Sequence, residues 1–345
     1  AEVLVAKGIP GIGTQFRVAS VPQGGEGGIR NIVSRFMATE NGTTVVVSDY
    51  DTSVVFTSGS GNITANTQTF TLNKGQSVVL SGYADNGTQA NYDGFIGALI
   101  SSTKPIAVST GNALGGPLTA TQGQDFNLDQ IVSYEQVGSE YLVVKGNGIN
   151  STEFPIVIAT ENNTEIFING STTPFATINT GGYLIIPATF YQGTNHKNMY
   201  ITSSKPIYLY QVLAGSDDPA TTGMNFIPPL SCFFQKSVDL IPSVNTIGGT
   251  QYTTDIIALT YANAAVTING NVTNYVNIDS TQSNALQNIL KNEIKEKQEL
   301  KNGDVIDLHQ TVNGQNLFVI FTIEPLDIRY AHDVTRKYEY DKEEM

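Results

Sequence analysis

Cysteine is almost absent from this sequence: Cys232 is the only one in 345 residues. A single cysteine excludes an intrachain disulfide and a cluster of thiolate metal ligands. Because two phenylalanines follow Cys232, we interpret it as a small buried hydrophobic residue and not as a catalytic thiol, which would need a nearby histidine. The three histidines, His196, His309 and His332, are scattered and lack the spacing of metal ligands.

Charged residues are also few, at 14% of the chain, and acidic residues outnumber basic ones by 31 to 18. The resulting net charge of −13 repels phosphate backbones and anionic lipid surfaces, so a nucleic acid is not an expected partner. No apolar run approaches 18 residues, and we expect a chain that does not span a membrane. The first residues lack a charged start followed by a long apolar stretch, so we expect that any signal peptide has been removed.

What is abundant is typical of β-structure: 33 glycines, 16 tyrosines and many threonines, asparagines and valines, with no tryptophan. Short apolar segments recur every 8 to 12 residues or so between Gly/Asn turns, without helical periodicity. The sequence therefore predicts an all-β fold of tandem β-sandwich-like repeats. A chain of 345 residues is expected to divide into two or three cooperative units.

An internal repeat sets the expected order of the elements. Residues 38–45 (ATENGTTV) recur as residues 159–166 (ATENNTEI), and residues 100–108 (ISSTKPIAV) recur as residues 201–209 (ITSSKPIYL). A third, incomplete copy begins at residue 256. The first motif predicts a β-hairpin whose turn uses Asn or Gly at positive φ. In the second motif, proline cannot donate to a ladder, so we expect it at the first position or the edge of a strand.

The C-terminal residues differ in composition, since residues 281–345 hold 8 of the 18 basic and 12 of the 31 acidic residues. We expect a small α+β segment there, with a helix over residues 286–300 and a hairpin around Asn313-Gly314. The predicted units are therefore a first β block (1–135), a second β block (136–240), a partial third block (241–280) and a charged tail module (281–345).

Several segments together resemble the family named after the IgG Fc-binding protein. They include residues 13–18 (GTQFRV), 106–112 (IAVSTGN), 138–146 (GSEYLVVKG) and 225–232 (NFIPPLSC), within a stretch covering roughly residues 10–275. More closely, they are similar to surface proteins of Flavobacteria and other Bacteroidota, including gliding-motility adhesins exported by type IX secretion. The resemblance implies an adhesive protein that is secreted or on the cell surface, outside the outer membrane. It implies no catalytic residues, and the tail after residue 281 does not match.

Candidate ligand contacts lie in a loop rich in Gly and Asn between Gly82 and Gly94. There an aromatic ring offers contact area and a carboxylate offers a polar partner. The candidates are Tyr83, Asp85, Tyr92 and Asp93. A structural Ca²⁺ is the one cofactor considered, because loop carboxylates bind it in exported β-domains. The weak candidates for it are Asp125, Asp129, Asp217 and Asp218, for which the simpler interpretation is turn capping.

No residue pattern indicates catalysis. The serines lack a G-x-S-x-G nucleophile elbow, and no histidine stands in a recognisable relation to them. We therefore predict a non-enzymatic extracellular domain that contacts a surface, a glycan or a neighbouring protein through its loops. The alternative is a carbohydrate- or mucin-binding module attached to a secreted enzyme.

Overall fold

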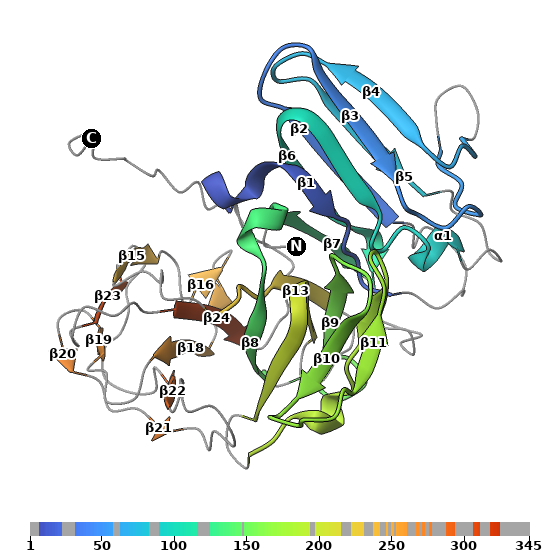
Figure 1. Ribbon diagram of the computed structural model, residues 1–345. Coiled ribbons are helices and arrows are strands. Elements are labelled where there is room, and N and C mark those ends of the chain that lie inside the picture. Colours follow the sequence, from blue (N-terminus) through green and yellow to red (C-terminus); the bar gives the residue numbers. More distant parts are fainter. Residues whose placement is uncertain are drawn as a thin grey trace.

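A computed structural model describes residues 7–22, 32–57, 63–82, 90–115, 125–146, 148–193, 197–214 and 222–230. Beyond residue 230 it describes only the backbone of ten strands. The regular structure of the described chain is mostly antiparallel β-strands with very little helix (Figure 1), which confirms the predicted all-β class. Its strands fall into three successive groups, called repeats 1, 2 and 3 below.

Repeat 1 forms one seven-stranded sheet, sheet A, in which the long strand β6 is central. Its strands are β1 (Ile12–Arg17), β2 (Ile32–Ala38), β3 (Thr43–Ser48), β4 (Gln68–Leu72), β5 (Ser77–Ser81), β6 (Leu99–Gly115) and β7 (Asp125–Ile131). The first half of β6 pairs with β1 and β3, and its second half pairs with β2 and β7. Strand β5 pairs with β2, and β4 pairs with β3.

Repeat 2 forms a second seven-stranded sheet, sheet C, with the same connectivity. Its strands are β8 (Gly138–Val144), β9 (Phe154–Ala159), β10 (Thr164–Ile168), β11 (Ala176–Ile178), β12 (Tyr183–Ile185), β13 (Asn198–Ala214) and β14 (Thr222–Phe226). Each pairing in sheet A has its counterpart in sheet C, with β13 in the place of β6. The two copies of the ATEN motif both connect the second strand to the third, so the predicted structural repeat is confirmed.

The helical elements of the described chain are short. They are η1 (Ile9–Gly11), α1 (Ala90–Asp93), η2 (Tyr134–Gln136) and η3 (Ala188–Phe190). Helix α1 follows residues 83–89, and η2 lies between the two sheets in sequence. Each of these short helices lies before or between strands, and none of them covers a sheet as a separate layer.

The described strands of repeat 3 are β15 (Ser237–Ile241), β16 (Thr246–Ile247), β17 (Thr250–Gln251), β18 (Thr253–Thr260), β19 (Val266–Ile268), β20 (Asn271–Val272), β21 (Val276–Asn277), β22 (Asn288–Glu293), β23 (Ile306–Gln310) and β24 (Phe318–Glu324). Strand β18 pairs with β22 and β24, while β23 pairs with β15 and β19. Repeats 1 and 2 have the same pairings. In repeat 3, β23 and β24 together take the place of the long strand, β6 or β13.

The C-terminal residues thus supply strands to repeat 3. The helix predicted for residues 286–300 is wrong at Asn288–Glu293, where β22 lies in register with β18 and places Leu290 opposite Ala258. The predicted hairpin around Asn313-Gly314 is also wrong, because β23 and β24 belong to different sheets. An apolar residue at every third or fourth position suggested a helix, but tertiary pairing along β18 decides the strand. The expected boundary at residue 281 falls between strands that pair with each other.

Repeats 1 and 2 share one hydrophobic core. The inner face of sheet A and one face of sheet C contribute to the same cluster, which contains Phe36 and Val108 from repeat 1 and Ile156 and Tyr210 from repeat 2. The opposite face of sheet C forms a second cluster around Ile166, Ile201 and Leu209. The upper ends of β9 to β12 in Figure 1 reach α1, where the two repeats meet. Repeat 2 therefore closes the core of repeat 1.

Candidate functional site

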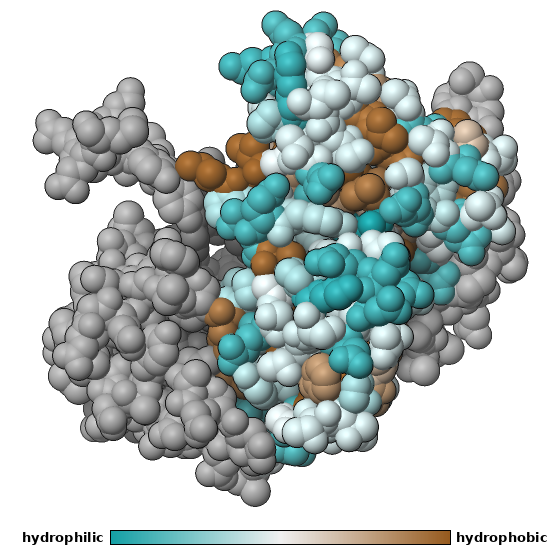
Figure 2. Space-filling view, viewed as in Figure 1, coloured by the Kyte–Doolittle hydropathy of each residue, from teal (hydrophilic) through white to brown (hydrophobic). Residues whose placement is uncertain are grey.

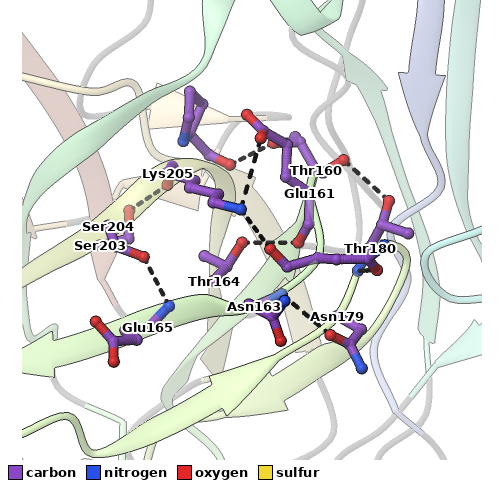
Figure 3. Close-up of polar contacts among 12 residues, drawn as sticks. Thr160, Glu161, Asn163, Thr164, Glu165, Asn179, Thr180, Ser203, Ser204 and Lys205 are labelled. Carbon is purple, nitrogen blue, oxygen red and sulfur yellow. Dashed lines mark hydrogen bonds and ion pairs between the residues drawn. The ribbon is translucent and has the colours of Figure 1, made fainter.

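The repeated motifs meet at one end of each sheet, a region called the hairpin tip. In repeat 2 it comprises residues 160–165, 179–180 and 203–206, drawn in Figure 3. Thr160 Oγ1 donates to the carbonyl oxygen of Pro206 at 2.5 Å. Lys205 Nζ donates to the carbonyl oxygen of Asn162 at 2.5 Å and lies 3.8 Å from a carboxylate oxygen of Glu161. These bonds connect the turn between β9 and β10 to the middle of the long strand β13.

Two asparagines join this turn to the turn between β11 and β12. The backbone N–H of Asn163 donates to Asn179 Oδ1 at 3.0 Å, and the N–H of Thr180 donates to Asn162 Oδ1 at 3.2 Å. Asn163 has a φ of 55°, a conformation that asparagine tolerates better than most residues. Thr164 Oγ1 closes the turn by donating to the carbonyl oxygen of Glu161 at 2.8 Å.

The tip of repeat 1 contains the same bonds. Thr39 Oγ1 donates to the carbonyl oxygen of Pro105 at 2.5 Å, and Lys104 Nζ donates to that of Asn41 at 2.6 Å. The N–H of Gly42, whose φ is 65°, donates to Asn73 Oδ1 at 3.2 Å. The motifs therefore recur because they hold the tip together, and the predicted use of Gly and Asn at positive φ is confirmed.

Proline is placed differently from the expectation. Pro105 and Pro206 lie inside β6 and β13, not at the first position or the edge of a strand. The register of the neighbouring first strand shifts at this point, between residues 101 and 106 of β6 and between residues 202 and 207 of β13. Neither proline has a register partner in the described neighbouring strands, so its missing N–H leaves no ladder bond unmade and proline is tolerated in mid-strand.

The tip of repeat 2 reaches a buried arginine of repeat 1. Arg17 Nη2 donates to Thr180 Oγ1 at 2.8 Å, and Nε donates to the hydroxyl of Tyr134 at 2.6 Å. Nη1 donates to Asp49 Oδ2 at 2.8 Å and to the carbonyl oxygen of Gly97 at 2.9 Å. The contact between the two repeats, called the seam below, is thus centred on a guanidinium whose donors bond to four residues from separate parts of the chain. A buried arginine is stable only when its donors are satisfied in this way.

A second polar contact crosses the seam at α1. The hydroxyl of Tyr183 in repeat 2 donates to Asp93 Oδ2 of repeat 1 at 3.3 Å. Burial, and secondly the negative charge of Asp93, raise the pKa of Tyr183 to about 12. Of the predicted contact residues, Asp93 therefore lies at the seam and is half-buried.

The other three predicted contact residues fall into two groups. Tyr92 is completely buried, so its ring packs in the interior and has no face open to a ligand. Tyr83 and Asp85 lie outside the described residues, as does most of their loop. Helix α1, which follows these residues in the sequence, lies at the seam. Contact of Tyr83 and Asp85 with a ligand stays a prediction.

Of the weak Ca²⁺ candidates, Asp129 is described in full. Its Oδ2 lies 3.1 Å from Lys7 Nζ and accepts the N–H of Phe226 in repeat 2 at 3.3 Å. Burial raises the pKa of this carboxyl, although Lys7 opposes the shift. Asp125 begins β7, and its side chain, like Asp217 and Asp218, lies outside the described residues. Within the described ranges, no group of three or more His, Cys, Asp or Glu side chains is placed to hold a metal ion.

A family model described as IgGFc binding protein matches residues 5–306. The chain belongs to this family. Neither the curated proteins nor the solved structures compared with the chain gave a match. The IgGFc-binding family is an extracellular type of binding domain and is not known as a family of enzymes. In the part of the chain that the structure describes, no helix could span a bilayer.

The match also bears on the C-terminal residues. It continues to residue 306, some way past residue 281, where the sequence had suggested that the resemblance ends. The corrected limit agrees with the pairing of β22 and β23 with strands of repeat 3. In this member of the IgGFc-binding family, the match thus covers repeats 1 and 2 and most of repeat 3.

Two buried polar residues of this IgGFc-binding domain were missed by sequence reasoning. One is Arg17. The equivalent position in repeat 2 is Leu142, so the internal repeat of the sequence does not single out Arg17. The other is Glu153, which is fully buried and accepts the N–H groups of Gly146 at 2.5 Å and Gly148 at 2.9 Å. Burial raises the pKa of Glu153. The hydrogen-bond partners of Arg17 and Glu153 lie outside any recognisable sequence motif. Both side chains hold loops in place.

Proposed function

We propose that this chain is an adhesive extracellular domain that binds its target through loops carried by a rigid stack of β repeats. The observation that carries the proposal is the seam, where Arg17 and the shared core fix repeat 2 against repeat 1 next to α1, the helix that follows Tyr83 and Asp85 in the sequence. A loop anchored to a rigid scaffold loses less conformational entropy on binding than one that is free. Membership of a family of binding domains supports the same conclusion.

The cellular setting that we propose follows from the resemblance of the sequence. The chain would belong to a surface adhesin of the Bacteroidota that is exported by type IX secretion and serves gliding motility. Its target would be a glycan, a protein or a neighbouring surface protein. The acidic net charge supports a target that is not a nucleic acid.

A binding screen of the whole chain tests the proposal. The chain is applied to a glycan array and to immobilised extracellular proteins, and a hit is then measured with the double variant Tyr83→Ala/Asp85→Ala. We expect that variant to lower the affinity by about tenfold or more, since a ring and a carboxylate are removed from the contact. Thr177→Ala, at an exposed position on β11, is the matched control and should leave the affinity unchanged.

Two outcomes would overturn the proposal. If no member of either panel binds, the adhesive function is wrong for these target classes. If a target binds and the double variant binds equally well, the loop assignment is wrong while adhesion stands. Binding to glycans alone would favour the alternative of a carbohydrate-binding module.

A further inference from the structure

The outer face of sheet A, the face turned away from its own core, carries most of the exposed apolar side chains. Four of the six large hydrophobic residues exposed in the described part of the chain lie on or beside it: Ile9, Ile12, Met37 and Val79. Ile12 and Met37 flank Ala107 in register, and Val79 lies opposite Arg35 in the next row. Figure 2 shows hydrophobic residues at the surface over the upper sheet and near the start of β1. A cluster of this kind is typical of an interaction surface.

The equivalent face of sheet C is already occupied within this molecule. Register places Ile158 where Met37 lies, Ile185 where Val79 lies, and Val137 where Ile12 lies. All three pack into the shared core beneath repeat 1. The structure therefore contains one example of what this face of a repeat binds, namely the loop end of another repeat.

The occupant of the sheet C face has a defined chemistry. It is the loop end of repeat 1, residues 17–21, 93–98 and 129–134. Its apolar residues Ile96 and Val132 join the core, and besides the bond from Arg17 to Thr180 it makes further polar contacts with repeat 2. The carbonyl of Val132 accepts the Tyr208 hydroxyl at 2.9 Å, and Asp93 and Asp129 each accept one hydrogen bond from sheet C.

The outer face of sheet A keeps apolar residues at these three positions. It differs from sheet C in the other residues that lie beside Val79 across the strands. Arg35 replaces Ile156, and Ser109 replaces Tyr210. A surface that pairs with this face must therefore bring a carboxylate to Arg35 while covering Met37 and Val79. A loop end built like that of repeat 1 has both features, and the chain as a whole carries an excess of 13 negative charges.

We propose that the outer face of sheet A binds the loop end of a repeat in a second copy of this chain. The loop end of repeat 1 is already used by sheet C, so the second copy contributes a different repeat. The contact joins unlike surfaces, and it therefore extends head to tail instead of closing as a symmetric dimer. Because Arg35 stands where sheet C has the apolar Ile156, the contact between two copies is weaker than the contact of sheet C with repeat 1. The association therefore depends on concentration.

Sedimentation equilibrium of the full chain over a roughly 100-fold range of concentration tests this proposal. We expect the average mass to rise with concentration, and Met37→Glu to raise the dissociation constant by about tenfold or more. Thr177→Glu is the matched control, because Thr177 is exposed on the edge strand β11 and belongs neither to sheet A nor to a loop end. It should associate like the unaltered chain.

Folding is checked by the melting temperature of each variant. If Met37→Glu is unfolded, Val79→Lys replaces it, since the Val79 side chain is 58% exposed. A photo-crosslinker at position 79 should join two copies through a loop end. A chain that stays monomeric throughout, association that Met37→Glu and Thr177→Glu weaken equally, or crosslinks from sheet A to sheet A would each overturn the proposal.

Discussion

Gly97 of repeat 1 and Gly181 of repeat 2 approach each other across the seam with no room for a side chain. A Cβ added to Gly97 would lie 1.7 Å from the carbonyl oxygen of Gly181. Both glycines have positive φ, 83° and 73°, so neither position suits another residue. The turn between β11 and β12 can therefore dock in this way on repeat 1 only while position 97 remains glycine.

Gly97→Ala should destabilise the protein far more than Gly75→Ala. Gly75 holds the place in repeat 1 that Gly181 holds in repeat 2, has a φ of 80°, and has nothing within 4 Å of an added Cβ. Gly75→Ala costs about 1 kcal/mol of backbone strain. Gly97→Ala adds a steric clash and separates the repeats, for a total of roughly 3 kcal/mol or more. Urea denaturation measures both, and equal losses would mean that the seam does not depend on this approach.

The tip asparagines provide a matched pair. Asn41→Ala and Asn162→Ala each remove one acceptor for a turn N–H, that of Lys74 and that of Thr180. Each loss should cost about 1 kcal/mol. Because Thr180 also accepts a hydrogen bond from Arg17, Asn162→Ala should cost more than Asn41→Ala. Free energies of unfolding from chemical denaturation decide the order, and a larger loss for Asn41→Ala would contradict the role of the tip in the seam.

Alkaline pH should weaken the seam through Tyr183. Its pKa in the folded protein is about 12, raised by burial and then by Asp93, against 10.0 for a free tyrosine. The folded state therefore favours the neutral phenol, whose contribution is complete below pH 10 and is lost as the pH rises towards 12. Tyr183→Phe should lose stability less steeply over this interval. Thermal melts at several pH values test this; equal slopes for Tyr183→Phe and the unaltered chain would contradict it.

Removal of residues 281–345 should unfold repeat 3 and spare the other two. The cut takes away β22 and β24, which pair with β18 on its two sides, and β23, which pairs with β15 and β19. We expect limited proteolysis of the shortened chain to degrade it back to about the end of β14. A truncated chain that keeps repeat 3 resistant would show instead that residues 281–345 are a separate module.

The sequence was most informative where the determinants are local. The turn residues Gly42 and Asn163 have the predicted positive φ, and the two hairpins occupy equivalent places, because a few consecutive residues fix each turn. The loop candidates Tyr83 and Asp85 remain predictions. Tyr92 illustrates the limit of the approach, because a tyrosine in a loop sequence gives no sign of whether its ring is buried.

Long-range partners could not be predicted. Arg17 bonds to Thr180, 163 residues away, and nothing near either residue indicates the pairing. The apolar residues around Leu290 fit both a helix and a strand, and only the neighbouring strand β18 decides between them. Pro105 and Pro206 lie in mid-strand because the register of the neighbouring first strand shifts at that point, which no local sequence pattern indicates.

The unusual length of β6 and β13 has a mechanical consequence. Each strand has 17 residues and extends for roughly 55 Å. One half of each is held by the first and third strands of its repeat, and the other half by the second and seventh. Tension applied along such a strand loads all four ladders in shear, so that many hydrogen bonds resist together and none can be peeled away singly. Each repeat should therefore resist extension along its length, a property that the proposed adhesive function would use.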